Sequence, residues 1–143
     1  MNLDELKLEV YDDLKIDKEH LDTESLKNQE IKAKYLDVKS RYELLLFKAK
    51  GDYKRIYRDK WEYYGGKADA KIYVSKPFDI KVLKTDLSVY ITSDQDVIDA
   101  ENKIGYLETV VDYVKGVIKS VDNRGWDIKN AIEWKKFEAG VTY

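Results

Sequence analysis

The residues in this chain that could do chemistry are cations rather than nucleophiles, and they gather between positions 48 and 60. This stretch holds six basic and two acidic side chains: Lys48, Lys50, Lys54, Arg55, Arg58, Lys60, Asp52 and Asp59. Aromatic residues lie within it and just beyond it, namely Tyr53, Tyr57, Trp61, Tyr63 and Tyr64. Cations attract phosphates and release counterions, and flat rings stack on unpaired bases. The pattern favours a surface for a flexible polyanion, with single-stranded nucleic acid as the first candidate.

Helical spacing would place part of this set on one line, which we call the basic stripe. Lys50, Lys54 and Arg58 follow one another at intervals of four residues, and Trp61 continues the line. The apolar seam of the same helix points away from it by more than a quarter turn. With the flanking cations, the candidate DNA-binding residues are Lys50, Lys54, Arg55, Arg58, Trp61 and Lys67.

The same residues also have a purely structural interpretation. A charged helix face is often a solvated surface with ordinary ion pairs along the helix. Trp61, Tyr63 and Tyr64 could likewise pack at the end of a helix rather than face a ligand. Residue types and spacing leave both interpretations open.

Length and composition limit the kind of protein to which these residues can belong. The chain has 143 residues, which is typical of one domain. Charged residues make up 38% of it, the mean hydropathy is −0.62 and the formal charge is −2. Binding to a polyanion must therefore come from the distribution of charge rather than its sum. There is no cysteine, which excludes thiolate catalysis and disulfides. Without a signal-peptide pattern or a long apolar run, we expect a soluble intracellular protein.

Periodic apolar residues predict a mainly α fold with a coiled-coil-like seam. Leu3, Leu6, Val10 and Leu14 form one stripe and predict a helix over 3–15. A near-heptad seam predicts a helix over 25–64, about 60 Å long, which should end at Gly65-Gly66. A chain of this size cannot bury so long a helix, so part of it should meet another subunit or solvent. The seam residues are Ile31, Tyr35, Val38, Tyr42, Leu45, Ala49, Tyr53 and Ile56.

The second half of the chain is more varied. Residues 67–92 include β-favouring runs around Pro77, the only proline, and predict a small hairpin or an ordered extended loop. Ser93 or Asp94 should cap a long helix over 94–121. Asn123-Arg124-Gly125 should break that helix, and a short helix over 126–139 should end at Gly140.

The last of these elements is rich in large apolar side chains. They could dock on the protein's own core or form an oligomerisation face. The candidate oligomerisation residues are Trp126, Ile128, Ile132, Trp134 and Phe137, of which Trp134 falls off the main stripe.

Several motifs that resemble catalytic or metal sites are incomplete. Gly65-Gly66-Lys67 lacks the upstream glycine and the hydroxyl residue of a phosphate loop. His20, the only histidine, has no partner residues for a metal or nucleophilic site. Asp94 and Asp96 start like a calcium loop, but Ile98 stands where an oxygen ligand is needed, so helix capping explains them better. We expect neither a metal nor a cofactor, and no enzymatic activity.

Two segments resemble a known family. Residues 124–129 read RGWDIK and residues 137–140 read FEAG, which resembles the C-terminal signature of the UvsY recombination mediators of T-even-like phages. Residues 58–66 read RDKWEYYGG, which resembles that family's basic segment. The order of the segments also matches, and the likeness is loose over 67–92.

The resemblance implies a non-enzymatic accessory protein of phage DNA recombination, repair and replication, acting in the cytoplasm of the infected host cell. Such proteins bind single-stranded DNA, contact a RecA-like recombinase and a single-strand DNA-binding protein, and help load the recombinase. They form ring-like homo-oligomers, which implies six or seven subunits here. The family's two basic DNA-contact positions fall on Arg58 and Lys60, and its self-association helix falls on the region from Trp126 to Phe137.

Two classes of function follow. The first is a single-stranded-DNA-binding recombination mediator. The alternative is a structural coiled-coil assembly protein whose charged face only keeps it soluble. A measurement of binding to single-stranded DNA would distinguish these two functions.

Overall fold

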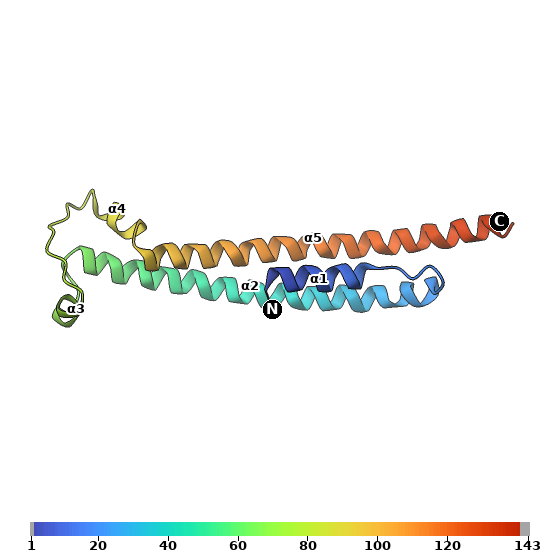
Figure 1. Ribbon diagram of the computed structural model, residues 1–143, viewed down its shortest axis with the longest axis horizontal. Helices are drawn as coiled ribbons and strands as arrows, with labels where there is room; N and C mark the ends of the chain where they lie inside the picture. Colours follow the sequence, from blue (N-terminus) through green and yellow to red (C-terminus); the bar gives the residue numbers. More distant parts are fainter. Residues whose placement is uncertain (1, 141–143) are drawn as a thin grey trace. The chain divides into compact units, whose positions relative to one another are not determined.

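The protein is mainly helical, as predicted. The computed structural model describes residues 2–140, which contain five helices and no strand (Figure 1). The helices are α1 (Leu3–Leu14), α2 (Leu21–Tyr64), α3 (Ala70–Ser75), α4 (Leu87–Thr92) and α5 (Gln95–Glu138). None of these five has the length and apolarity needed for a membrane span.

The described residues form two compact units. Unit 1 comprises those up to Tyr42 together with those from Thr109 onward, and unit 2 comprises Glu43–Glu108. Because α2 and α5 both contribute to both units, the organisation as one domain stays a prediction.

Local sequence explains where the helices begin and end. Asn2 and Glu5 form a capping box at the start of α1, each side chain accepting from the other's backbone N–H. At the end of α2, the N–H of Lys67 donates to the carbonyl of Glu62, and Gly66 adopts a positive φ of 73°. This Schellman turn confirms the predicted stop at Gly65-Gly66. Gly140 follows α5 with a φ of 75°, also as predicted.

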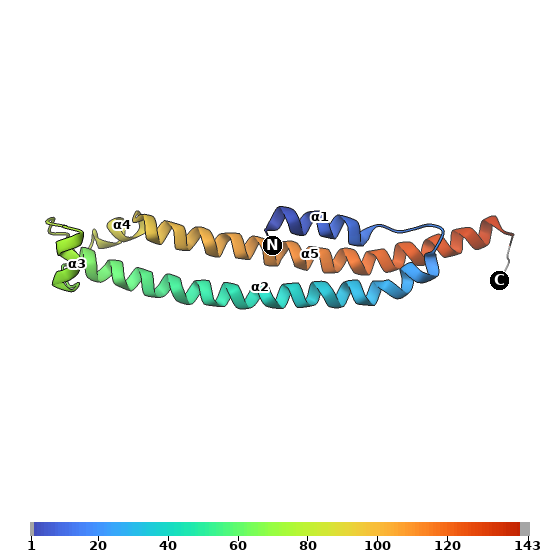
Figure 2. The ribbon, with the colours of Figure 1, turned by 60° about the horizontal axis from the view of Figure 1, so that its bottom comes forward.

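Unit 1 is a three-helix arrangement. In both views α1 lies alongside the first half of α2 and the middle of α5 (Figures 1 and 2). Each large apolar side chain buried there contributes roughly 1.5–3 kcal/mol. Tyr35 is fully buried and its hydroxyl donates to Asp13 at 2.6 Å. The buried core consists of Leu6, Val10, Ile31, Tyr35, Val38, Val110, Val114, Val117 and Val121.

The predicted break at Asn123-Arg124-Gly125 is wrong, and so are the helix end at 121 and the separate helix over 126–139. Instead α5 runs without interruption from Gln95 to Glu138. Its buried stripe continues through the supposed break, because Val121, Arg124 and Ile128 follow the same spacing of three and four and all are buried. A cation therefore occupies a core position of the helix.

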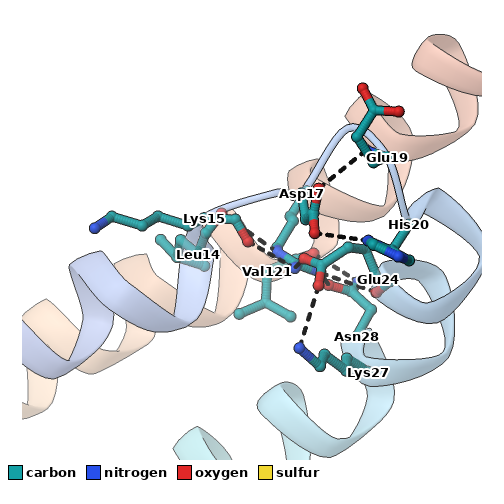
Figure 3. A network of polar contacts seen from close by, with 10 residues as sticks. Leu14, Lys15, Asp17, Glu19, His20, Glu24, Lys27, Asn28 and Val121 are labelled. Carbon is teal, nitrogen blue, oxygen red and sulfur yellow. Dashed lines mark hydrogen bonds and ion pairs between the residues drawn. The ribbon is translucent and has the colours of Figure 1, made fainter.

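The surroundings of Arg124 explain how a charge is accommodated there. Its guanidinium donates to the carbonyls of Leu14, Lys15 and Glu24 at 3.3, 3.0 and 3.1 Å, and to the side-chain oxygen of Asn28 at 3.1 Å. It also forms an ion pair with the carboxylate of Glu24 (Figure 3). All these partners lie on α1, on α2 or on the connection between them, so the pairing ties α5 to both.

Gly125 has a packing role rather than a helix-breaking one. A Cβ at this position would lie 3.1 Å from Nδ2 of Asn28, which is tighter than ordinary contact. The same amide donates to the carbonyl of Val121 at 2.9 Å. The missing side chain thus lets α2 approach α5 closely.

The predicted hairpin over 67–92 is also wrong, because two short helices replace it. Asp69 caps α3 by accepting from the N–H of Lys71 at 3.1 Å. Tyr73 stacks on Tyr63 with a centroid distance of 5.5 Å, and its hydroxyl donates to the carbonyl of Tyr63 at 2.7 Å. β-favouring residues follow their tertiary contacts more than their intrinsic preference.

An aromatic cluster organises this end of unit 2. Tyr64, Phe78 and Tyr90 meet at centroid distances between 5.0 and 5.9 Å, and Tyr63 adds contacts to Tyr64 and Phe78. Ring pairs of this kind contribute about 0.5–1.5 kcal/mol each beyond the area they bury. Ile91 of α4 is buried, so α4 lies against the unit through both Tyr90 and Ile91.

Candidate nucleic-acid interface

The second half of α2 presents the basic stripe to solvent. Lys50, Lys54 and Arg58 are exposed, and Trp61 is 41% exposed. On the seam of the same segment Ala49 is buried, and Tyr53 and Ile56 are half-buried. The assignment of Leu45 to the seam is wrong, because Leu45 is 50% exposed and Leu46 is half-buried in its place. A helix with 3.6 residues per turn gradually rotates away from a strict heptad spacing, so the buried position shifts by one residue.

The cations of the stripe have weak partners. Lys50 lies 3.9 Å from Glu108, and Arg58 lies 3.9 Å from Asp59. Arg55, which flanks the stripe, forms a closer pair with Asp52 at 2.5 Å. Lys54 forms no ion pair with any residue between 2 and 140. Exposed pairs of this kind are worth between zero and about 1 kcal/mol. A phosphate can therefore replace these carboxylates at little cost.

Trp61 and Lys67 are brought together by the turn after α2. The Lys67 ammonium lies 4.5 Å from the centre of the Trp61 ring. A Cβ at Gly65 would approach the Trp61 carbonyl to 2.8 Å, so this tight return of the chain depends on a glycine there. The exposed ring and its cation thus form a cation–π pair at the end of the stripe, which we call the Trp61–Lys67 platform.

Lys60 is placed differently from the other candidate cations. Its side chain is 18% exposed and pairs with Asp96 at 2.8 Å and with Asp94 at 3.5 Å. Burial by itself would lower the pKa of Lys60, but the hydrogen bond to Asp96 and the two carboxylate charges outweigh it, so the pKa is raised. Lys60 thus joins the end of α2 to the start of α5 within unit 2.

Asp94 is the centre of that junction. One of its oxygens accepts from the N–H of Asp96 at 2.9 Å, which confirms the predicted cap, and the other accepts from the Tyr64 hydroxyl at 2.6 Å. Burial would raise the pKa of Asp94, yet the bonds from Tyr64 and the Asp96 backbone and the charge of Lys60 hold it below its usual value. Burial and Asp94 together raise the pKa of Tyr64.

The structural interpretation of the tyrosines is correct for two of them. The rings of Tyr63 and Tyr64 pack into the aromatic cluster of unit 2. Tyr57 is half-buried beside Tyr53, with 6.0 Å between the ring centres. Trp61 is therefore more exposed than these tyrosine rings.

The candidate oligomerisation residues divide into two groups. Ile128 is buried in the protein's own core, and Ile132 is half-buried. Trp126, Trp134 and Phe137 are 62%, 62% and 72% exposed. The rings of Trp134 and Phe137 stack, with centroids 5.6 Å apart and planes at 27°; we call them the ring pair.

Sequence reasoning missed an open groove of about 800 Å³ in unit 2. Its lining includes the apolar side chains of Ala49, Ile56 and Ala100, together with five carboxylates and three lysines: Asp52, Asp59, Asp94, Asp96, Asp99, Lys60, Lys76 and Lys103. On a helical wheel Asp52 and Asp59 lie roughly half a turn from the basic stripe. The sequence thus places basic and acidic residues on opposite faces of α2. That pattern could have indicated the acidic groove.

Comparison with known proteins decides the family. A model of the family described as "Recombination, repair and ssDNA binding protein UvsY" matches residues 9–141. The chain belongs to the UvsY family. The "Recombination protein uvsY" of Enterobacteria phage T4 is similar to it, with 26% identity over 140 residues that cover 98% of this chain and 99% of that protein. The family resemblance expected from the two sequence motifs is thus confirmed.

Solved structures of the UvsY family show the same fold. A crystal structure of the bacteriophage T4 recombination mediator protein UvsY in lattice type II has a TM-score of 0.84 at 24% identity, covering 97% of this chain and 98% of that one. A second, in lattice type IV, has a TM-score of 0.82 at 21% identity, covering 96% and 99%.

Proposed function

We propose that this protein is a single-stranded-DNA-binding recombination mediator that helps load a RecA-like recombinase onto DNA covered by single-strand DNA-binding protein. Membership of the UvsY family supports this role, since the family is described by recombination, repair and ssDNA binding. The observation that carries the DNA-binding part is the exposed line of Lys50, Lys54, Arg58 and Trp61 on α2.

The chemistry of the stripe suits an unpaired strand. Its cations can neutralise successive phosphates, and the Trp61–Lys67 platform offers a ring face to a base. Arg55 flanks the stripe, and Lys60 reaches a phosphate if one displaces Asp96. Stacking surfaces tolerate any base, so we expect affinity with little sequence preference.

Self-association would strengthen this binding. One stripe holds few phosphates, and a ring of six or seven copies raises the effective concentration of the remaining stripes once the first has bound. The exposed rings of Trp126, Trp134 and Phe137 are the proposed contacts between subunits. The mediator acts in the cytoplasm of the infected host cell. There, single-stranded DNA bent around such a ring would be transferred to the recombinase.

The test is binding of a fluorescein-labelled oligothymidylate measured by anisotropy at several salt concentrations. We expect K54A/R58A to weaken binding at least tenfold and to reduce the slope of log affinity against log salt by about 1.4, since each single-strand phosphate contact contributes about 0.7. K115A/K119A, which removes two exposed lysines of unit 1, is the matched control.

Unchanged affinity and slope in K54A/R58A would show that the stripe is misassigned. A protein that assembles but ignores the oligonucleotide even at low salt would instead be a structural coiled-coil assembly protein.

A further inference from the structure

Phe47 is an exposed aromatic side chain for which the chain itself provides no aromatic or cationic partner. It lies on α2 in unit 2, and its side chain is 67% exposed. Tyr53 and Tyr57 pack against one another, and the Lys67 ammonium lies over the Trp61 ring. Between residues 2 and 140, no such ring or cation contact is found for Phe47. A ring left in water stabilises the fold little, so this one is available to a ligand.

Phe47 also lies on the same face of α2 as the basic stripe. Lys54 follows it by seven residues and Arg58 by eleven, which are close to two and three whole turns of a helix. Trp61 stands at the other end of this line, about 21 Å away at 1.5 Å per residue. The run of cations is therefore bracketed by two exposed rings. Single-strand binding sites have this composition, because cations follow the phosphates and rings stack on the bases.

The helix leaves one side of Phe47 uncovered. A helical side chain leans toward the N-terminus, so residue i+4 normally lies over residue i. Gly51 stands four residues after Phe47 and has no side chain, and a Cβ there would meet no atom within 4 Å. Lys50, three residues after Phe47, lies with its ammonium 3.9 Å from Glu108 of α5. The C-terminal side of the Phe47 ring is thus open to a flat group.

Gly51 has no structural explanation of its own. A glycine inside a helix is destabilising relative to alanine, and Gly51 has neither a positive φ nor a close neighbour that would require it. Gly105 and Gly116 of α5 are equally open, but Glu101 and Asp112 stand four residues before them instead of a ring. Among these three open helical glycines, only Gly51 lies one turn after an exposed aromatic side chain.

We propose that Phe47 and the open position at Gly51 form a base subsite at the N-terminal end of the basic stripe. An unpaired base of the bound strand stacks on the C-terminal side of the Phe47 ring, and its phosphates face Lys50 and Lys54. Glu43, one turn before Phe47, ends the run of cations, so the path of the phosphates stops here. This inference rests on the DNA-binding part of the proposed function and adds a second ring to it.

The experiment compares strands with and without bases. A fluorescein-labelled oligothymidylate and an abasic strand of the same length carry the same phosphates, and anisotropy measures the affinity for each. Phe47→Ala should weaken binding of the oligothymidylate at least about fivefold, which corresponds to the loss of one weak base–aromatic stack. The slope of log affinity against log salt should stay unchanged, because no phosphate contact is lost. The affinity for the abasic strand should also stay unchanged.

Further variants test the ring and the open position separately. Phe47→Tyr keeps a flat ring and should retain the affinity, whereas Phe47→Leu keeps only apolar bulk and should lose it. Gly51→Leu places a side chain over the subsite and should weaken binding of the oligothymidylate. The same variant should raise the thermal midpoint, because leucine favours a helix more than glycine does. A purely structural role of Gly51 would not combine lower affinity with higher stability.

The chain offers a matched control for each change. Tyr11→Ala removes a ring with almost the same exposure, 68%, from α1 and should leave the affinity unchanged. Gly116→Leu makes the same substitution at an open position of α5 and should raise the thermal midpoint without changing the affinity. Native mass spectrometry should show that the Phe47 and Gly51 variants assemble like the unaltered protein.

Full affinity of Phe47→Ala or of Gly51→Leu for the oligothymidylate overturns the inference. Equal weakening of both strands by Phe47→Ala also overturns it, as does altered assembly, which would make Phe47 a contact between copies. The K54A/R58A variant should bind both strands more weakly. If it keeps its affinity for the abasic strand, the DNA-binding proposal for the stripe fails, and this failure is distinct from that of the base subsite.

Discussion

Arg124 of α5 and Glu24 of α2 form an ion pair in which the two side chains are 3% and 7% exposed. Three backbone carbonyls and the Asn28 side chain accept the remaining guanidinium hydrogens. A buried pair satisfied in this way costs little as long as it is complete, and becomes expensive when one partner is removed. The pair therefore fixes the position of α5 against α1 and α2 rather than adding net stability.

The first prediction concerns this pair. Arg124→Ala and Glu24→Ala should each lower the free energy of unfolding by about 3–5 kcal/mol, because each leaves a buried charge without its partner. The double variant should lose clearly less than the sum of the two. Lys27→Ala, which removes the exposed cation beside Glu24, should cost less than about 1 kcal/mol. Urea unfolding followed by circular dichroism measures all four, and strictly additive losses would contradict the assignment.

The second prediction concerns acid stability. The pKa of the Asp94 carboxyl is held below its ordinary value of 3.8, so its contribution to stability is present above that pH and is lost as pH falls through the lowered pKa. Tyr64→Phe removes a hydrogen bond to a charged group and should cost about 1.5–3 kcal/mol at pH 7. The loss of stability on acidification should then be smaller than in the unaltered protein.

Urea unfolding at a series of pH values from 3 to 7 checks this expectation. Tyr57→Phe is a matched control, since no hydrogen bond of its hydroxyl to a residue in the described range is found. Parallel pH curves for Tyr64→Phe and the unaltered protein would show that Asp94 does not depend on Tyr64.

The third prediction separates two roles of Lys60. Asp96 lies 2.8 Å from the Lys60 ammonium and competes with any phosphate for it. If Lys60 contacts DNA, Asp96→Asn should raise the affinity for oligothymidylate several-fold. Asp99→Asn removes the same charge from the same groove without touching Lys60, so it measures the general electrostatic effect. Equal gains in the two variants would mean that Lys60 serves the packing of unit 2 rather than the strand.

The fourth prediction concerns His20. Its Nδ1 lies 2.8 Å from Asp17, and the hydrogen bond and charge of that carboxylate raise the pKa of His20 above the usual 6.5. The linked stability is therefore complete below pH 6.5 and is lost as pH rises through the raised pKa. NMR titration of the ring should show the raised value, and Asp17→Asn should return it toward 6.5. Glu19→Gln, which leaves the Asp17 contact in place, should change it less.

Local rules predicted the parts of this protein that depend on neighbouring residues. The apolar repeat of α1 and α2, the stops at Gly66 and Gly140 and the cap at Asp94 all follow from contacts within a few residues along the chain. The exposed basic stripe belongs to this class too, because spacing on one helix decides which side chains share a face.

Where contacts with distant residues competed with local sequence preferences, the tertiary contacts determined the secondary structure. The Asn123-Arg124-Gly125 sequence is typical of a helix end, yet partners about a hundred residues earlier in the chain satisfy Arg124 and fit against Gly125. The β-favouring run around Tyr73 became helical because the exposed end of α2 offers that ring a stacking partner and its hydroxyl a carbonyl.

By itself, the sequence determined the helical class, the family and the line of cations on α2, since each is written in types and spacings along the chain. Only the tertiary structure decided that Lys60 is held by carboxylates, that Ile128 is buried while Trp134 is not, and that an acidic groove exists. These properties depend on which surfaces meet, and burial and pairing between distant segments leave no local signature in the sequence.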